Sequence, residues 1–219
     1  MRVDLYYLVH KAQRFQLFGF ARELSRADLG DAGVRERVAT EVRELVALLE
    51  DHARNEEKHV HPLFARSGGE GAAAGTAGGG AVESIEREHR ALERHFAELT
   101  AVVDGGRWSE VYPATMRLIG EYLLHIDEEE RAQAEVLWPR YTDEELGAVV
   151  ARFKAERAPA AARADFSLML PALSVPELAR VLGGVRSSAP KEHADAMLDL
   201  ARVALGAERW AQVEEVLAP

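Results

Sequence analysis

The chain of 219 residues contains no cysteine. This absence excludes disulfides, zinc ribbons, thiolate nucleophiles and iron–sulfur clusters, because each of them needs a cysteine sulfur. Any metal ion that the protein binds must therefore be held by nitrogen and oxygen atoms.

Basic charge is scarce relative to acidic charge. The formal net charge is -10 at pH 7, and no stripe of lysine and arginine with interleaved aromatic residues offsets it. A surface of this sign repels phosphate backbones. We therefore expect no nucleic-acid partner.

Long apolar runs are also missing. The opening stretch MRVDLYYLVHKAQRFQLFGF contains Asp4, His10, Lys11 and Arg14 where a signal peptide needs an uninterrupted apolar core. No other run approaches the length of a membrane span. The sequence therefore predicts a soluble, cytoplasmic protein with no membrane partner.

Runs that alternate strictly between apolar and polar residues are absent, and apolar residues recur at helical spacing almost throughout. The predicted fold class is all-α. Four long helices are expected over residues 4–26, 34–64, 81–103 and 109–138, with Pro62 bending or ending the second. The Gly- and Ala-rich stretch 66–80 is expected to be a flexible connector.

Shorter helices are expected in the last third of the chain. Two of them begin with a capping-box pattern, in which Thr142 pairs with Glu145 and Ser174 with Glu177. The expected ranges are 143–156, 160–170, 175–183, 190–205 and 207–217.

The pattern H-x-x-x-E-E occurs twice, once in the second long helix and once in the fourth. Residues four apart on a helix are separated by only about 40° around its axis. His52 with Glu56, and His125 with Glu129, therefore each present an imidazole and a carboxylate on one face.

The other two long helices supply one histidine each, His10 and His89. Four neutral imidazoles and two carboxylates form a nitrogen and oxygen set that suits iron, and also manganese or zinc, and the carboxylates can bridge two ions. Two six-coordinate ions have about twelve positions, of which these side chains and a bridging oxygen fill about ten. Space remains for a small exogenous ligand.

These segments, with HPLF after the first, EH in EREHRALE and LWP after the second, resemble the hemerythrin-like family, also called the HHE cation-binding domain, over residues 1–140. The resemblance implies an antiparallel four-helix up-down bundle around a non-haem di-iron centre. Members bind dioxygen or nitric oxide, sense oxygen or iron, or handle iron damage. By resemblance the metal ligands are His10, His52, Glu56, His89, His125 and Glu129.

One departure from the family pattern lies one turn after His89. The oxygen-carrying branch has a second histidine there, whereas this chain has Glu93. Glu93 shares a helix face with His89, and we interpret it as a substitute ligand, a proton acceptor near the site or a charge at the core edge. This departure bears on reversible oxygen carriage and leaves the prediction of a metal site unchanged.

Two tyrosines lie about one turn before predicted ligands, Tyr6 before His10 and Tyr122 before His125. Either hydroxyl could donate a hydrogen bond to a metal ligand. Packing in the core is the alternative reading of both residues.

The remaining histidines and acidic neighbours are sorted by helix geometry. His59 returns to the face of His52 and could line or extend the site, whereas His61 falls on the opposite face and is expected to cap or pack at the helix end. His95 and His193 are expected at the surface. A solvated acidic face is expected for Glu57, Glu128 and Glu130.

The predicted function is the binding of dioxygen or another diatomic by two non-haem iron ions. Two alternatives stay open: an enzyme that activates dioxygen or reduces peroxide or nitric oxide, and an iron- or redox-responsive protein that binds a partner. Residues 141–219, which also resemble the tail of some bacterial hemerythrin-like proteins, are expected to cover the bundle, act as a lid or form a dimer surface. The chain is thus expected to be a monomer or a homodimer.

Overall fold

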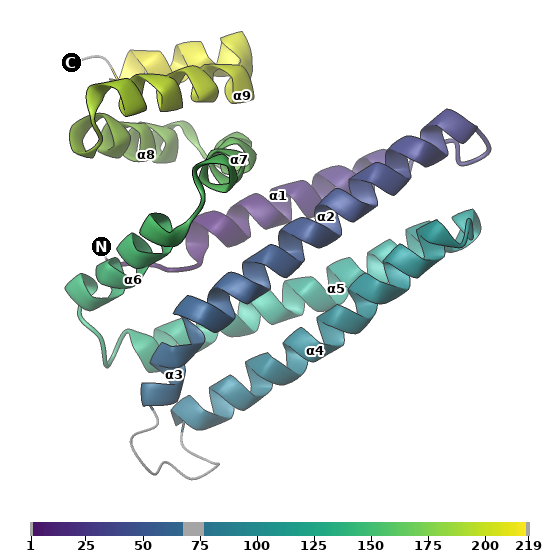
Figure 1. Ribbon diagram of the computed structural model, residues 1–219, viewed down its shortest axis with the longest axis horizontal. Coiled ribbons are helices and arrows are strands. Elements are labelled where there is room, and N and C mark those ends of the chain that lie inside the picture. Colours follow the sequence, from purple (N-terminus) through teal and green to yellow (C-terminus); the bar gives the residue numbers. More distant parts are fainter. Residues whose placement is uncertain (1, 68–76, 218–219) are drawn as a thin grey trace. The chain divides into compact units, whose positions relative to one another are not determined.

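The computed structural model describes residues 2–67 and 77–217. Within these two ranges the regular elements are helices and there is no strand, in agreement with the predicted all-α class (Figure 1). The elements are α1 (Tyr7–Leu24), α2 (Ala32–His59), α3 (His61–Ser67), α4 (Ala77–Asp104), α5 (Trp108–Ala132), the π-helical η1 (Gln133–Leu137), α6 (Asp143–Glu156), α7 (Pro159–Met169), the 3-10 helix η2 (Leu170–Ala172), α8 (Val175–Ser188) and α9 (Lys191–Leu217).

The predicted connector and the predicted helices at the end of the chain can be compared with the structure. The expected connector 66–80 is shorter than predicted, because α3 extends to Ser67 and α4 begins at Ala77; residues 68–76 lie outside the described residues. The two helices expected over 190–205 and 207–217 are confirmed, because Gly206 inside α9 has a non-helical backbone (φ 71°, ψ 168°) and separates two helices there. A positive φ of this size favours glycine, which has no Cβ.

The second long helix was expected to run to residue 64, but α2 ends at His59 and α3 begins at His61. Pro62 has no backbone N–H, so it cannot continue the ladder of helical hydrogen bonds. Leu63 N–H instead donates to the carbonyl of Val60, three residues back, over 2.8 Å. The interruption changes the direction in which the side chains after His59 point.

The chain forms two compact units. The first comprises Met1–Tyr6 and Gln16–Phe153, and the second comprises Tyr7–Phe15 and Lys154–Pro219. The domain boundary near residue 140 stays a prediction.

Two apolar clusters form the core of the first unit. The larger cluster contains 19 buried residues contributed by α1, α2, α4 and α5, among them Leu17, Val42, Leu99 and Leu118. The smaller cluster includes Tyr6, Phe64 and Leu137. Along α2, α4 and α5 the residues of the larger cluster are separated from those of the smaller one by a stretch that belongs to neither. The residues that flank this stretch are Leu49 and Val60 at α2, Ile85 and Leu92 on α4, and Ile126 and Ala132 at α5.

A tight turn returns the chain from α4 to α5. Gly106 has a φ of 65°, its N–H donates to Val103, and the next N–H donates to Val102, each over 3.0 Å. This is the Schellman arrangement that commonly ends a helix at glycine. His89 lies 17 residues before Gly106 and His125 lies 19 residues after it. The turn therefore brings these two histidines to a similar height on neighbouring helices.

Both predicted capping boxes are confirmed. Thr142 N–H donates to Glu145 over 2.8 Å, and Glu145 N–H donates to the Thr142 hydroxyl over 3.2 Å. At the start of α8 the Ser174 N–H and hydroxyl both donate to Glu177, each over 2.6 Å. Such boxes satisfy backbone donors that a helix start leaves open.

In the second unit, Glu177 also accepts hydrogen bonds from α1. Lys11 Nζ donates over 2.6 Å and the Tyr7 hydroxyl donates over 2.8 Å. Although burial opposes ionisation, the hydrogen bonds from Lys11, Ser174 and Tyr7 lower the pKa of the Glu177 carboxyl to about 2. Around this network the unit has its own apolar core, which includes Leu170, Leu173, Leu178, Leu182, Ala201 and Val213.

None of the helices in the described ranges combines the length and the apolar character that a membrane span requires.

Candidate metal centre

Polar side chains occupy the gap between the two apolar clusters of the first unit. On α2, His52 Nε2 lies 2.8 Å from Glu56 Oε1. On α5, His125 Nε2 lies 3.3 Å from Glu129 Oε1. These are the two same-face pairs of the H-x-x-x-E-E repeat, and the helical spacing holds because α2 and α5 are regular at these positions.

His89 of α4 lies between the two carboxylates. Its Nε2 is 3.6 Å from Glu129 Oε1 and 3.8 Å from Glu56 Oε2, and its ring centroid is 4.7 Å from that of His125. Glu56, His89, His125 and Glu129 are all buried and each offers one atom within 4.8 Å of the others. Such a group of imidazole and carboxylate atoms could hold a metal ion.

His52 joins the same two glutamates in a second group. One atom of each of His52, Glu56 and Glu129 lies within 4.8 Å of the others. Glu56 and Glu129 thus take part in both groups, as carboxylates that bridge two ions would. His10 is fully buried in the Tyr7–Phe15 segment of α1, and its role as a ligand stays a prediction.

Two further carboxylates contact the outer nitrogens of the histidines. Glu57 Oε1 lies 3.3 Å from Nδ1 of His89, and Glu88 Oε2 lies 3.0 Å from Nδ1 of His125. A carboxylate in this position holds the proton on Nδ1 and leaves Nε2 free to bind a metal. Because Nε2 of both rings is the nitrogen nearest Glu129, both imidazoles are oriented with the metal-binding nitrogen toward the cluster.

The sequence reading did not find these outer contacts. Glu57 was expected in a solvated acidic face, and its side chain is indeed 53% exposed, but one of its oxygens reaches His89 on the neighbouring helix. Glu88 was not among the predicted site residues. Neither contact follows a helical repeat, since each joins two different helices, so the spacing along the chain carries no signal for them.

The charges of the cluster favour a bound cation. Burial disfavours a positive charge on His89, yet the hydrogen bond and charge of Glu129, with the charge of Glu56 and the contact of Glu57, raise the pKa of His89 to about 9. Burial, and then the charges of Glu129 and Glu56, raise the pKa of the Tyr6 hydroxyl well above its usual range. Two buried carboxylates need a positive partner, which a metal ion supplies.

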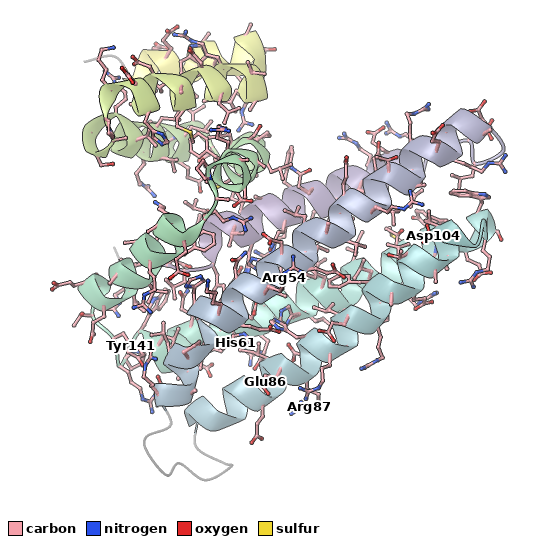
Figure 2. All side chains as sticks on the ribbon, in the orientation of Figure 1. Arg54, His61, Glu86, Arg87, Asp104 and Tyr141 are labelled. Atoms are coloured by element: carbon pink, nitrogen blue, oxygen red, sulfur yellow. The ribbon has the colours of Figure 1, made fainter. Side chains whose placement is uncertain are left out.

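His61 is buried directly after the end of α2, so its predicted packing at the helix end is confirmed, whereas the prediction that it lies on the face away from the site was wrong. Its ring centroid is 5.1 Å from that of His89, and Figure 2 shows it near the junction of α2 and α3, far from Asp104 at the other end of α4. The prediction assumed an unbroken helix through residue 64. Burial, followed by the charge of His89, lowers the pKa of His61.

A cavity of about 330 Å³ adjoins the cluster. Leu92 and Phe96 form part of its apolar wall, and Glu93 and Tyr122 also line it. The cavity reaches the candidate ligands His52, Glu56, His89 and His125.

The other predicted site residues lie as follows. Tyr122 is buried with its ring centroid 6.1 Å from that of His125. Glu93 is exposed, and His59 packs edge-on against Phe153 with centroids 5.8 Å apart. Among the residues that the structure describes, neither Glu93 nor His59 belongs to a group of candidate ligands. His95 lies 3.7 Å from Glu98 in a partly exposed pair.

The fold and the cluster together define a helical protein with a buried histidine and glutamate site for a cation. The family model described as "Hemerythrin HHE cation binding domain" matches residues 1–137. The chain therefore belongs to the hemerythrin HHE cation-binding domain family, as its motifs predict. Searches of curated proteins and of solved structures found no match.

Proposed function

We propose that the protein is a non-haem di-iron protein that binds dioxygen or another diatomic molecule. The observation that carries the proposal is that Glu56 and Glu129 belong to both groups of candidate ligands. Carboxylates shared in this way bridge paired ions in di-iron helical bundles. His52 joins the two glutamates in one group, and His89 and His125 join them in the other; His10 is the further ligand that the family resemblance implies. The nitrogen and oxygen set favours iron, with manganese or zinc as the alternatives.

The family's up-down bundle is part of the proposal. Along α2 and α5 the larger apolar cluster precedes the smaller one, whereas along α4 the smaller cluster comes first. Tyr6 of the smaller cluster likewise precedes Leu17 of the larger one. This alternation supports four antiparallel helices within residues 1–140. Of the predicted extension over 141–219, α6 contributes Leu146 and Val149 to the smaller cluster.

The protein's own residues have distinct roles in this proposal. Ferrous ions at the site would supply the electrons and an open coordination position for the diatomic molecule. Glu57 and Glu88 hold the protons on Nδ1 of His89 and His125, which keeps both Nε2 atoms available. Leu92 and Phe96 form an apolar part of the cavity wall, beside the charged side chains of Glu50, Arg54 and Glu93.

The size of the cavity favours a second candidate, an enzyme that turns over a peroxide or a small organic substrate. A volume of about 330 Å³ exceeds what one diatomic molecule fills, since a water molecule takes about 30 Å³ of the liquid. Glu93 lines the cavity and offers a carboxylate that can accept a proton from a substrate.

Iron loading followed by anaerobic reduction and exposure to oxygen tests both candidates. We expect about two irons per chain, and an absorption spectrum that cycles reversibly with oxygen supports binding. Steady oxygen or peroxide consumption without a stable adduct supports the enzyme. The matched control is His95→Ala, which removes a histidine outside the cluster. Fewer than one metal ion per chain, unchanged in the double variant His52→Ala and His125→Ala, would contradict the metal site itself.

A further inference from the structure

His61 has a buried ring nitrogen close to the candidate metal centre. The side chain is 8% exposed, and its Nε2 has no hydrogen-bond partner among the described residues. A buried polar atom without a partner costs free energy. A metal ion bound beside His89, whose ring centroid is 5.1 Å from that of His61, could satisfy that atom.

The backbone holds His61 firmly in this position. The helix break at Val60 and Pro62 turns the chain inward, and Val60, Leu63 and Phe64 anchor it in the smaller apolar cluster. The imidazole therefore cannot swing out to solvent without unpacking this cluster.

The distances between rings fit binding to a common ion. An imidazole nitrogen binds a transition metal at about 2.1 Å, which places the ring centroid about 3.2 Å from the ion. Two rings on one ion then have centroids about 4.5 Å apart at right angles and about 5.5 Å apart at an angle of about 120°. The separations of 4.7 Å for His89 and His125 and 5.1 Å for His61 and His89 both lie in this range.

The coordination of that ion leaves room for another side chain. Glu56, His89, His125 and Glu129 offer four atoms to it, and a six-coordinate ion takes about two more. Glu93, on the same helix as His89, is exposed and outside the group. Glu93 therefore does not fill either of these two positions.

We propose that His61 is an additional nitrogen ligand of the ion bound by His89 and His125, an inference that rests on the proposed metal centre. His61 lies outside the 4.8 Å group, so coordination would require its ring to turn about the Cβ–Cγ bond. The α3 segment thus supplies to this ion one of the two positions that the group of four leaves open.

Cobalt(II) binding to the full chain tests the proposal. Wild type, His61→Ala and His61→Gln are compared with His59→Ala, which removes another buried histidine two residues away. Affinity for each of the two ions is measured by chelator competition, and the visible absorption of cobalt reports the ligand number. In both His61 variants we expect one ion to bind about tenfold to a hundredfold more weakly and its absorption to change, whereas His59→Ala leaves both readouts unaltered.

The outcomes separate this inference from the function on which it rests. If wild type binds no cobalt, the metal centre and the inference both fail. If wild type binds two ions and the His61 variants match it in affinity and absorption, only the inference is overturned. Should the variants not fold, the ¹⁵N shift of the His61 imidazole in wild type decides: coordination moves it between the metal-free and zinc-loaded protein, and an unmoved signal overturns the proposal.

Discussion

Glu88 Oε2 and His125 Nδ1 lie 3.0 Å apart and join α4 to α5. The contact fixes which nitrogen of His125 faces Glu129, so a residue that touches no metal controls the geometry of a candidate ligand. Glu57 does the same for His89 from α2.

Replacing Glu88 should weaken metal binding without unfolding the protein. In Glu88→Gln the acceptor of His125 loses its charge, and we expect the affinity for one ion to fall by about tenfold to a hundredfold. Chelator competition measures it. The control is Glu86→Gln, an exposed residue two positions earlier on α4 that is labelled in Figure 2. Equal affinities in the two variants would show that the Glu88 contact does not orient His125.

Metal binding should stabilise the chain, and Glu129 should be required for this. An ion at about 100 times its dissociation constant adds about 2.7 kcal/mol to the free energy of unfolding. We expect thermal melts of wild type to shift upward with iron(II) or cobalt(II) and downward with chelator, and Glu129→Gln to lose most of the shift because both groups share this carboxylate.

The neighbouring Glu128→Gln is the control for that melt. Its side chain is partly exposed and pairs with Arg131 over 3.0 Å, outside the cluster. A metal-dependent shift that survives in Glu129→Gln would argue against a bridging role.

The metal-free chain should lose stability as pH rises from about 6.5 to about 9. His89 has a folded-state pKa of about 9, above the usual value near 6.5. Over this interval the folded chain holds a proton that the unfolded chain has released, so the free energy of unfolding declines as the pH rises. The stabilising contribution of His89 is fully present only below a pH of about 6.5.

Denaturant unfolding in chelator at several pH values measures this decline, and His89→Gln removes the responsible group. We expect a flatter pH dependence in the variant. Metal uptake by wild type near pH 7.5 should also release the proton of His89, which a weakly buffered indicator detects. Parallel pH curves for wild type and variant would refute the assignment.

Glu177 should stabilise the second unit at neutral pH. Its pKa of about 2 lies below the usual carboxyl value, so its contribution is present above about 4.3 and is lost as pH falls toward 2. Glu177→Gln removes the charge that Lys11 binds, and we expect a loss of about 1–3 kcal/mol at pH 7. The difference from wild type should vanish near pH 2, whereas the exposed Glu192→Gln should change little at either pH.

Features that depend on neighbours along one helix could be predicted from the sequence. The pairs of His52 with Glu56 and of His125 with Glu129 follow from a repeat of four residues, and so do the capping boxes at Thr142 and Ser174. The geometry of a continuous helix is set by local backbone bonds, so spacing alone is sufficient there.

Contacts between helices depended on the tertiary structure. The pairing of Glu57 with His89 and of Glu88 with His125 is set by how far each helix is rotated and shifted against its neighbour, which packing of the apolar clusters decides. His61 was misplaced for a related reason, because extrapolating a helix across Pro62 ignores the backbone bond that proline removes. The sequence thus determined which side chains could bind a metal, and the packing of the helices determined which of them meet.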